Sequence, residues 1–199
     1  MKSDWIRPFV FILIVGISGC GPRSVPVPAY NPGAMATEAL ALYDANKDGR
    51  LSVEELKKCP SLLESLPQID KNKDNALDAD ELEERFRQYA ASKTGLFDLS
   101  LTIYQGGQPL VGATVTMVPE AFMGSVVKPA TGKSDSEGHV RFRAEGNEYD
   151  GLALGCYRIE VSLKDEAGKE KIPVHYNRET TLGKEINLSV RRWELKLGY

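Results

Sequence analysis

The spacing of hydrophobic residues divides this chain into three parts. Residues 8–17, PFVFILIVGI, form one short apolar run. Between residues 35 and 94, apolar residues lie on the expected faces of helices that flank two acidic stretches. From Phe97 onward apolar and polar residues alternate, which is the period of a half-buried strand. The pattern predicts an α+β multidomain protein, in which a small all-α unit precedes a β-rich unit.

The alternating part, residues 95–199, predicts a β-sandwich. Turn signals such as Gly106-Gly107, residues 135–138 and Ala167-Gly168 separate its segments. Short alternating strands at this spacing are typical of an antiparallel β-sandwich, here of about seven strands. The alternating apolar positions are Leu99, Leu101, Ile103, Ala113, Val115, Met117, Val140, Phe142, Tyr157, Ile159, Val161, Leu163, Ile186, Leu188, Val190, Trp193, Leu195 and Leu197.

The helical part, residues 35–94, contains residues that mark where helices start and end. Asp80–Lys93 predicts a helix with one apolar side, and Pro60 predicts that the preceding helix ends near Cys59. Ser61 and the glutamate three residues later have the spacing of a capping box, while Pro67 keeps any helix there short or kinked.

Two acidic stretches, DANKDGRLSVEE and DKNKDNALDADE, place oxygen-bearing side chains at the same offsets. A twelve-residue loop of this kind supplies the oxygens that a hard divalent cation needs from positions 1, 3, 5, 7, 9 and 12. Gly49 makes the sharp turn at position 6 of the first loop, and Asn75, which tolerates left-handed backbone, replaces it in the second. The spacing predicts two Ca²⁺ sites. The predicted ligands are Asp44, Asn46, Asp48, the Arg50 carbonyl, Ser52 (through a water) and Glu55 in the first loop, and Asp70, Asn72, Asp74, the Ala76 carbonyl, Asp78 and Glu81 in the second.

These loops resemble the EF-hand family, whose D-x-N-x-D-G-x-L-S-x-x-E pattern is complete in the first loop. The resemblance implies that Leu51 and Leu77, at position 8, face each other across a short strand pair. The compact pair, with its short connector, is similar to the tandem EF-hands of bacterial surface and secreted proteins. Leu and Ile rather than Met beside the loops favour stabilisation over a sensor that opens a binding groove.

The first nineteen residues have the architecture of a secretory signal, because a basic start precedes an apolar run that is too short to span a bilayer. The ISGC sequence that ends at Cys20 resembles the lipobox of bacterial lipoproteins. The resemblance implies lipidation at Cys20 and anchoring at the bacterial cell envelope, with Gly21 favouring the outer membrane. The alternative is a plain secretory signal cleaved nearby.

Residues 20–34 contain four prolines and no helical or strand pattern, which predicts an extended tether. A proline-rich recognition motif is the alternative. The whole chain has 199 residues, is 42% hydrophobic and has a formal net charge of −3. That balance favours neither nucleic acid nor an anionic membrane surface as a partner.

The phrases GQPLVGATVTMVP, TGKSDSEGHVRF and GCYRIEVS resemble the carboxypeptidase-regulatory-like, or transthyretin-like, sandwich domain of small bacterial lipoproteins. The later IPVHYNRETTLGKEINL resembles the segment that closes such domains. The likeness runs from Phe97 to Tyr199. It implies a non-catalytic accessory or binding domain.

No set of residues predicts catalysis. His139 and His175 fall in or beside expected strands, where an ordinary histidine is commoner than a catalytic base. Ser134, Asp135 and His139 lie close in sequence, but a triad depends on spatial roles that one turn does not provide. Cys59 and the cysteine at 156 could pair in an oxidising compartment, although buried free thiols are favoured.

The sequence therefore predicts a calcium-binding, membrane-anchored envelope lipoprotein with a structural or adhesive role and without enzymatic activity. One alternative is a dockerin-like module that recruits a protein partner through an exposed apolar stripe on its second helices. Another is a sandwich that binds a glycan or peptide on an aromatic platform, for which Trp193 and several tyrosines are candidates, although Trp193 fits a core strand equally well.

Overall fold

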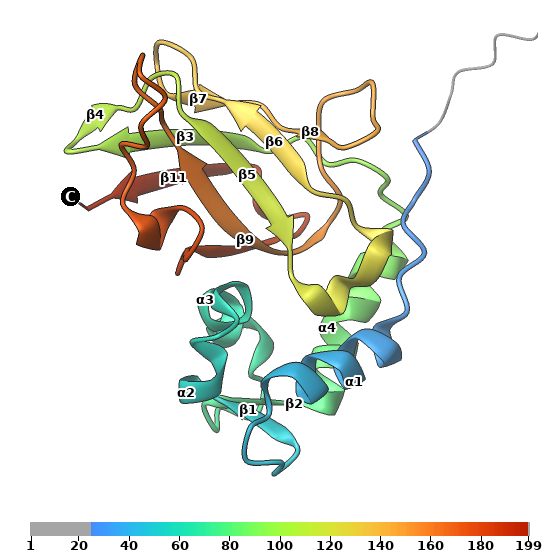
Figure 1. The fold of residues 1–199 in the computed structure, drawn as a ribbon. Coiled ribbons are helices and arrows are strands. Elements are labelled where there is room, and N and C mark those ends of the chain that lie inside the picture. The colour runs from blue at the N-terminus through green and yellow to red at the C-terminus, as the bar shows by residue number, and fades with distance from the viewer. Residues whose placement is uncertain (1–24, 199) are drawn as a thin grey trace, which may run out of the picture.

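The computed structural model describes residues 25–198. The predicted signal, the lipidation site Cys20 and the start of the tether lie outside these residues. A helical unit forms one end of the molecule and two packed sheets form the other (Figure 1). Within the described part of the chain, every helix is too short or too polar to cross a bilayer.

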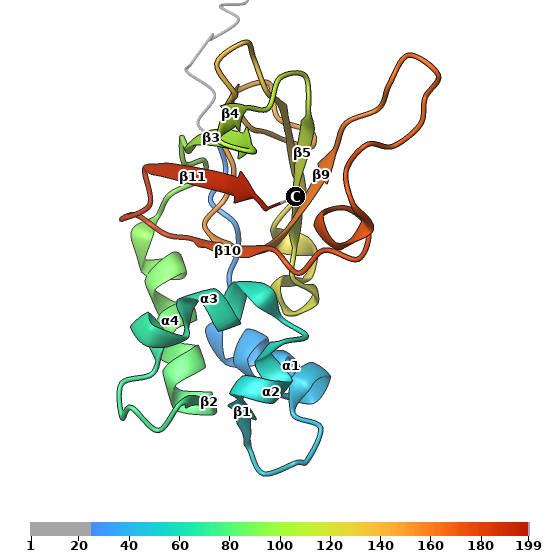
Figure 2. The same ribbon diagram turned by 90° about the vertical axis from the view of Figure 1, so that its left-hand side faces the viewer.

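The helical unit contains two helix-loop-helix segments joined by a two-stranded ribbon. Leu51 lies opposite Leu77 in that antiparallel ribbon, which confirms the predicted contact. The loops lie at the far end from the sheets, and the helices lie between (Figures 1 and 2). The elements are α1 (Pro32–Tyr43), β1 (Arg50–Ser52), α2 (Val53–Leu56), α3 (Pro60–Ile69), β2 (Ala76–Asp78) and α4 (Ala79–Ser92).

Two local predictions at the helix starts differ from the structure. Helix α1 begins at Pro32, inside the predicted tether, because the Asn31 side chain caps it. The tether segment before it packs on the fold, since the Tyr30 hydroxyl donates to the Leu154 carbonyl at 2.7 Å. The predicted capping box at Ser61 is wrong: the cap position lies two residues earlier, at Cys59, which makes no side-chain capping bond, and α3 starts at Pro60.

The sandwich has nine strands rather than about seven. One sheet has the order β10-β9-β5-β6-β8 and is antiparallel throughout; the other has the order β11-β3-β4, with β7 also paired to β3. Its strands are β3 (Ser100–Gln105), β4 (Gln108–Pro109), β5 (Thr114–Pro119), β6 (Ala130–Lys133), β7 (His139–Val140), β8 (Arg143–Ala144), β9 (Gly155–Ser162), β10 (Gly183–Ile186) and β11 (Arg192–Leu197). Short 3₁₀ turns occupy Ala121–Val126 and Val174–Tyr176.

Two features of the sheets depart from the alternating pattern. Strands β3 and β11 run parallel, because the chain crosses from β10 in one sheet to β11 in the other without a hairpin that would set their directions. Strand β10 ends at Ile186, and Leu188, expected within it, is 51% exposed. The expected fold class, helices followed by a β-sandwich with mainly antiparallel sheets, is confirmed.

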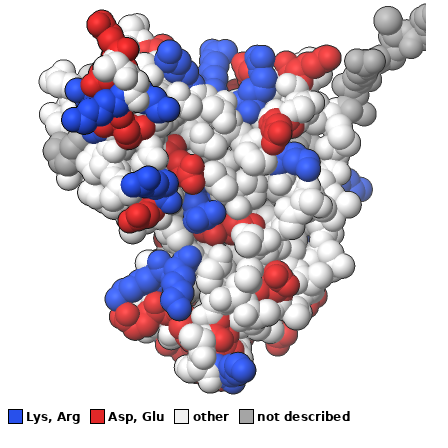
Figure 3. Space-filling model, in the orientation of Figure 1, with Lys and Arg blue, Asp and Glu red and all other residues white. Residues whose placement is uncertain are grey.

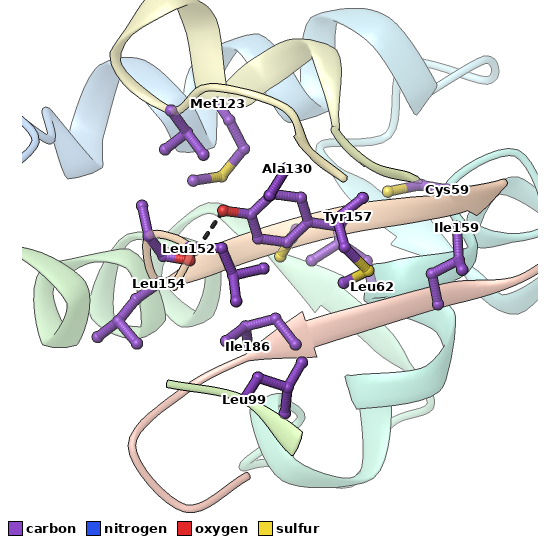
Figure 4. Packing of buried hydrophobic residues seen from close by; sticks show 14 of the residues in the cluster. Cys59, Leu62, Leu99, Met123, Ala130, Leu152, Leu154, Tyr157, Ile159 and Ile186 are labelled. Carbon is purple, nitrogen blue, oxygen red and sulfur yellow. Dashed lines mark hydrogen bonds between the residues drawn. The ribbon is translucent and has the colours of Figure 1, made fainter. Parts of the chain in front are cut away.

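The helices and the sheets share one hydrophobic core. Cys59 and Leu62 from the helical unit pack near Tyr157, Ile159 and Ile186 from the sheets (Figure 4). The backbones of α3 and β10 also come very close. A Cβ atom at position 183 would lie 2.2 Å from the Ser61 nitrogen, so only glycine fits there.

A buried ion pair joins α4 to β10. The Glu185 side chain is 1% exposed and accepts two parallel bonds from the Arg85 guanidinium, at 2.5 and 2.6 Å. The Tyr89 hydroxyl donates to the same carboxylate at 2.5 Å. Bidentate geometry and a further donor are the conditions under which a buried carboxylate is tolerated.

A second buried carboxylate, Glu120, joins the other helices to the sheet. It accepts from the Ser61 hydroxyl at 3.0 Å and from the Tyr43 hydroxyl at 3.2 Å, and Arg158 lies 3.7 Å away. Burial raises the pKa of Glu120 above its ordinary value, although Ser61 and Arg158 favour its ionised form. Ser61 thus donates to the sandwich instead of capping its own helix.

Replacing Arg85 by alanine should destabilise the protein by about 3 kcal/mol or more, because the Glu185 carboxylate would stay buried without its counter-ion. Urea unfolding with calcium present measures the change. The matched control is Arg87→Ala on the same helix, whose exposed pair with Glu83 should contribute less than about 1 kcal/mol. The double variant Arg85→Ala/Glu185→Gln should recover part of the loss. Equal losses in R85A and R87A would contradict the structural role of the pair.

Candidate metal centre

The first loop is folded around the carboxylate of its first residue. Asp44 follows α1 directly, and its side chain accepts hydrogen bonds from the backbone amides of Lys47, Asp48 and Gly49 at 2.6, 3.3 and 2.9 Å. These bonds turn the chain back on itself. They hold positions 1 to 6 of the loop in a tight curve.

The last residue of the loop closes it. One Glu55 oxygen accepts from the amides of Ala45 and Asn46 at 2.9 and 3.3 Å, and the other accepts from the Ser52 hydroxyl at 2.7 Å. Glu55 and Ser52 also form a capping box that starts α2. The Ser52 hydroxyl bond is the main cause that lowers the pKa of Glu55 to about 2. Glu55 is therefore ionised at neutral pH, as a metal ligand must be.

The second loop repeats this arrangement. The Asp70 carboxylate accepts from the amides of Lys73 and Asn75 at 2.6 and 2.9 Å. Glu81 reaches back to the Lys71 amide at 2.9 Å, and with Asp78 it forms the capping box that starts α4. Both loops thus bring their first and last carboxylates to the same end of the curve.

Left-handed backbone occurs at two positions of each loop. Gly49 and Asn75, at position 6, have φ of 84° and 62°, which confirms that asparagine takes the role of the turn glycine. Lys47 and Lys73, at position 4, have φ of 61° and 62°. Nothing in the residue type signals this second turn, since lysine rarely adopts such a conformation.

The two loops are also connected by charge. The Arg50 guanidinium lies 2.8 Å from the Asp74 carboxylate, so position 7 of one loop contacts position 5 of the other. Lys71 of the second loop forms an ion pair with Glu84 on α4. The space-filling view shows basic side chains beside the carboxylates at this end of the molecule (Figure 3). The spacing of residues in the sequence does not indicate these pairs.

The donor chemistry of the loops suits a hard cation such as Ca²⁺. Each loop offers carboxylate, amide and backbone carbonyl oxygens, and no sulfur or imidazole; the first loop adds the Ser52 hydroxyl where the second has Asp78. Among residues 25–198, no three His, Cys, Asp or Glu side chains form a metal cluster by themselves. The loop carboxylates instead accept bonds from loop amides, so the fit rests on the mixed oxygen set and on the loop closure by Glu55 and Glu81. The ligand set given by the spacing stays a prediction.

The serine, aspartate and histidines considered as catalytic candidates make ordinary structural contacts. The Ser134 hydroxyl accepts from the Ala113 amide at 2.9 Å, and the Asp135 carboxylate holds the amides of its own turn. His139 lies 3.4 Å from Glu137, and His175 packs on its neighbour Tyr176. These contacts form no nucleophile-to-base relay within the described residues.

Cys59 and Cys156, the cysteines within the described residues, are buried and free. Burial, with Glu120 nearby, raises the pKa of Cys59 to about 12. The Cys156 sulfur lies 3.6 Å from the Tyr89 hydroxyl, and burial also raises the pKa of Cys156. Both thiols therefore remain protonated at neutral pH, and neither has the low pKa that makes a cysteine reactive.

The apolar side of α4 faces inward. Leu82, Phe86 and Tyr89 are 0–1% exposed. On α2, Val53 is 39% exposed and Leu56 is buried. An exposed apolar stripe, which a dockerin-like module requires, is therefore absent from these two described helices.

Comparison with known proteins supports the loop assignment. Residues 37–60 and 65–86 match the EF hand family, and these ranges contain both loops. This match supports calcium binding. No curated protein matches the chain in sequence.

Two solved structures of the major pilin subunit BcpA of Bacillus cereus, one of them a variant, resemble part of the chain with a TM-score of 0.31 and 18% identity. The matched region covers 51% of this chain and 29% of the pilin chain.

Replacing Glu55 by glutamine should weaken calcium binding at the first loop by about tenfold or more, because a charged bidentate ligand becomes neutral. Glutamine still supports a capping box, so α2 should form as before. Isothermal titration calorimetry with CaCl₂ measures the change, and Glu81→Gln makes the same test of the second loop. The control is Glu54→Gln, an exposed neighbour paired with Lys57. Unchanged binding in both E55Q and E81Q would show that these loops do not hold the ion.

Proposed function

We propose that this protein is a calcium-stabilised, lipid-anchored envelope protein, in which two EF-hand sites fix the helical unit against a non-catalytic sandwich. The observation that carries the proposal is the double role of Glu55 and Glu81. Each closes its loop as the final oxygen ligand, and each caps the helix that leaves the loop. An ion bound in the loop therefore bears directly on the start of that helix.

Charge supports a stabilising role for the ion. The first loop contributes three ligand carboxylates and the second contributes four. Without a cation these like charges repel one another and disfavour the compact loops. With free Ca²⁺ at about a hundred times the dissociation constant, each site would add roughly 2.7 kcal/mol to the stability.

The helices provide the link from the loops to the sandwich. Tyr43, the last residue of α1, precedes the ligand Asp44 and donates to Glu120. Arg85 lies one turn after Glu81 on α4 and pairs with Glu185. Order in the loops thus supports the position of the groups that hold the buried carboxylates. Such coupling fits a structural role for calcium.

Calcium should raise the melting temperature of the whole protein as one transition. Scanning calorimetry of the full chain with CaCl₂, with MgCl₂ and with a chelator measures the effect. The double variant E55Q/E81Q should lose the response to calcium, whereas E54Q should keep it. A sandwich that melts separately at a calcium-independent temperature would overturn the structural role, even if the loops bind the ion.

The lipobox-like sequence that ends at Cys20 supports a lipid anchor at the bacterial envelope, and a Cys20 variant tests it. Replacing Cys20 by serine should move the protein from the membrane fraction to the soluble fraction, because the acyl chains that hold it would be missing. Fractionation of bacterial cells that express each form measures this. Cys59→Ala, which keeps Cys20, is the thiol control and should stay with the membrane. Membrane partition of C20S equal to that of the parent chain would rule out lipidation.

A further inference from the structure

The outer face of the sheet formed by β3, β7 and β11 carries an open hollow of about 970 Å³. Leu101 and Val140 point into the core, so their neighbours along each strand project outward into the hollow. The volume is within the range of small-ligand sites. Neither the calcium loops nor the buried ion pairs lie in its lining.

Strand register places two arginines on either side of a serine. Arg192 of β11 pairs with Ser100 of β3, and the β3·β7 register, continued by one residue, brings Arg141 to the other side of Ser100. Strands lie about 4.8 Å apart, so the two arginine Cα atoms are roughly 10 Å apart. Two long guanidinium side chains over that span can converge on one small anion above a hydroxyl.

These donors make no hydrogen bond and no close ion pair among the described residues. That holds for the Arg141 and Arg192 side chains, although the charge of Arg141 is near enough to help lower the pKa of Asp135 on the rim. The Ser100 and Thr102 hydroxyls likewise make no hydrogen bond there. By contrast, the exposed Arg143 pairs with a carboxylate at 2.6 Å. The hollow therefore gathers unused donors on one side of one sheet.

The rim of the hollow limits the kind of anion. Three carboxylates also line it: Asp98, Asp135 and Glu194. They would repel a polymer that has a negative charge on every residue or sugar. Carboxylate oxygens do accept hydrogen bonds from hydroxyl groups. The mixture suits a ligand with one anionic group and several hydroxyls.

An aromatic ring lies next along the same face. Tyr104 lines an adjoining hollow of about 400 Å³ with Lys196 and Glu194, and Glu194 borders both hollows. Tyr104 is paired with Lys196 in the sheet. A phenol ring beside a polar hollow offers an apolar surface for the flat side of a sugar ring.

We propose that this face binds an acidic sugar of an extracellular or envelope polysaccharide. Its carboxylate lies between Arg141 and Arg192 above Ser100, its hydroxyls donate to the rim carboxylates, and a neighbouring sugar packs on Tyr104. The site is independent of the calcium-dependent role, because it uses no loop residue.

The probe is a hyaluronan tetrasaccharide, which alternates glucuronic acid with an uncharged sugar. The full chain with calcium present should bind it, and Arg192→Ala should weaken binding by about tenfold or more, since a charge-assisted pair is lost. Arg141→Ala should have a similar effect. Titration calorimetry measures the affinity, and binding should weaken as salt is raised.

The controls separate charge, sugar and fold. Arg178→Ala removes an exposed arginine outside the hollow and should bind like the parent chain. Chitotetraose, which lacks the carboxylates, should bind at least tenfold more weakly than hyaluronan. Thermal melting of R192A and R141A checks that both variants are folded. No binding at millimolar tetrasaccharide, equal binding of chitotetraose, or tighter binding of a tetraglutamate peptide or inorganic phosphate would each overturn the proposal.

Discussion

The hydrogen-bonded carboxylates Glu120 and Glu185 hold the helices and the sheets in one relative position. Both are nearly fully buried, and both accept from residues of the helical unit. A carboxylate removed from water costs several kcal/mol unless its partners are in place. A shifted docking would keep the apolar contact but leave these oxygens without donors. The apolar core therefore supplies attraction, and the two carboxylates select the arrangement.

In the proposed function, calcium in the loops acts on this contact between helices and sheets through the ends of the helices. Glu81 caps α4, and Arg85 lies one turn later on the same helix. If the start of α4 frays, the guanidinium that neutralises Glu185 is no longer held. The same reasoning applies to α1, whose last residue, Tyr43, reaches Glu120. A cation at the far end of the molecule can thus stabilise a contact that it does not touch.

Local chemistry explains which features could be predicted. The Leu51 to Leu77 contact and the turn at Asn75 depend on residues within one loop or on the repeat of that loop. Ser61 illustrates the limit, because the same hydroxyl can cap a helix or donate to a distant acceptor. Glu120 follows it by 59 positions. Only the tertiary fold decides between those two uses.

The sheets show the same limit in another form. Alternation identifies which residues of β3 and β11 face inward, but it does not give the direction of pairing. The parallel pairing of these strands is what places Arg192 beside Ser100, and the antiparallel pairing of β7 places Arg141 on the other side. The hollow therefore could not be predicted from the sequence, although each of its residues is visible there.

The two ends of α4 lie toward the two proposed sites, the calcium loops and the hollow on the sheet. Its first turn belongs to a calcium loop, and its last residue, Ser92, leads into the strand that lines the hollow. A helix of this length spans about 21 Å, which exceeds the Debye length of about 8 Å at physiological salt. Exposed charges at the loops are therefore screened from those in the hollow. Calcium can influence a ligand on the sheet only through the stability of the shared fold.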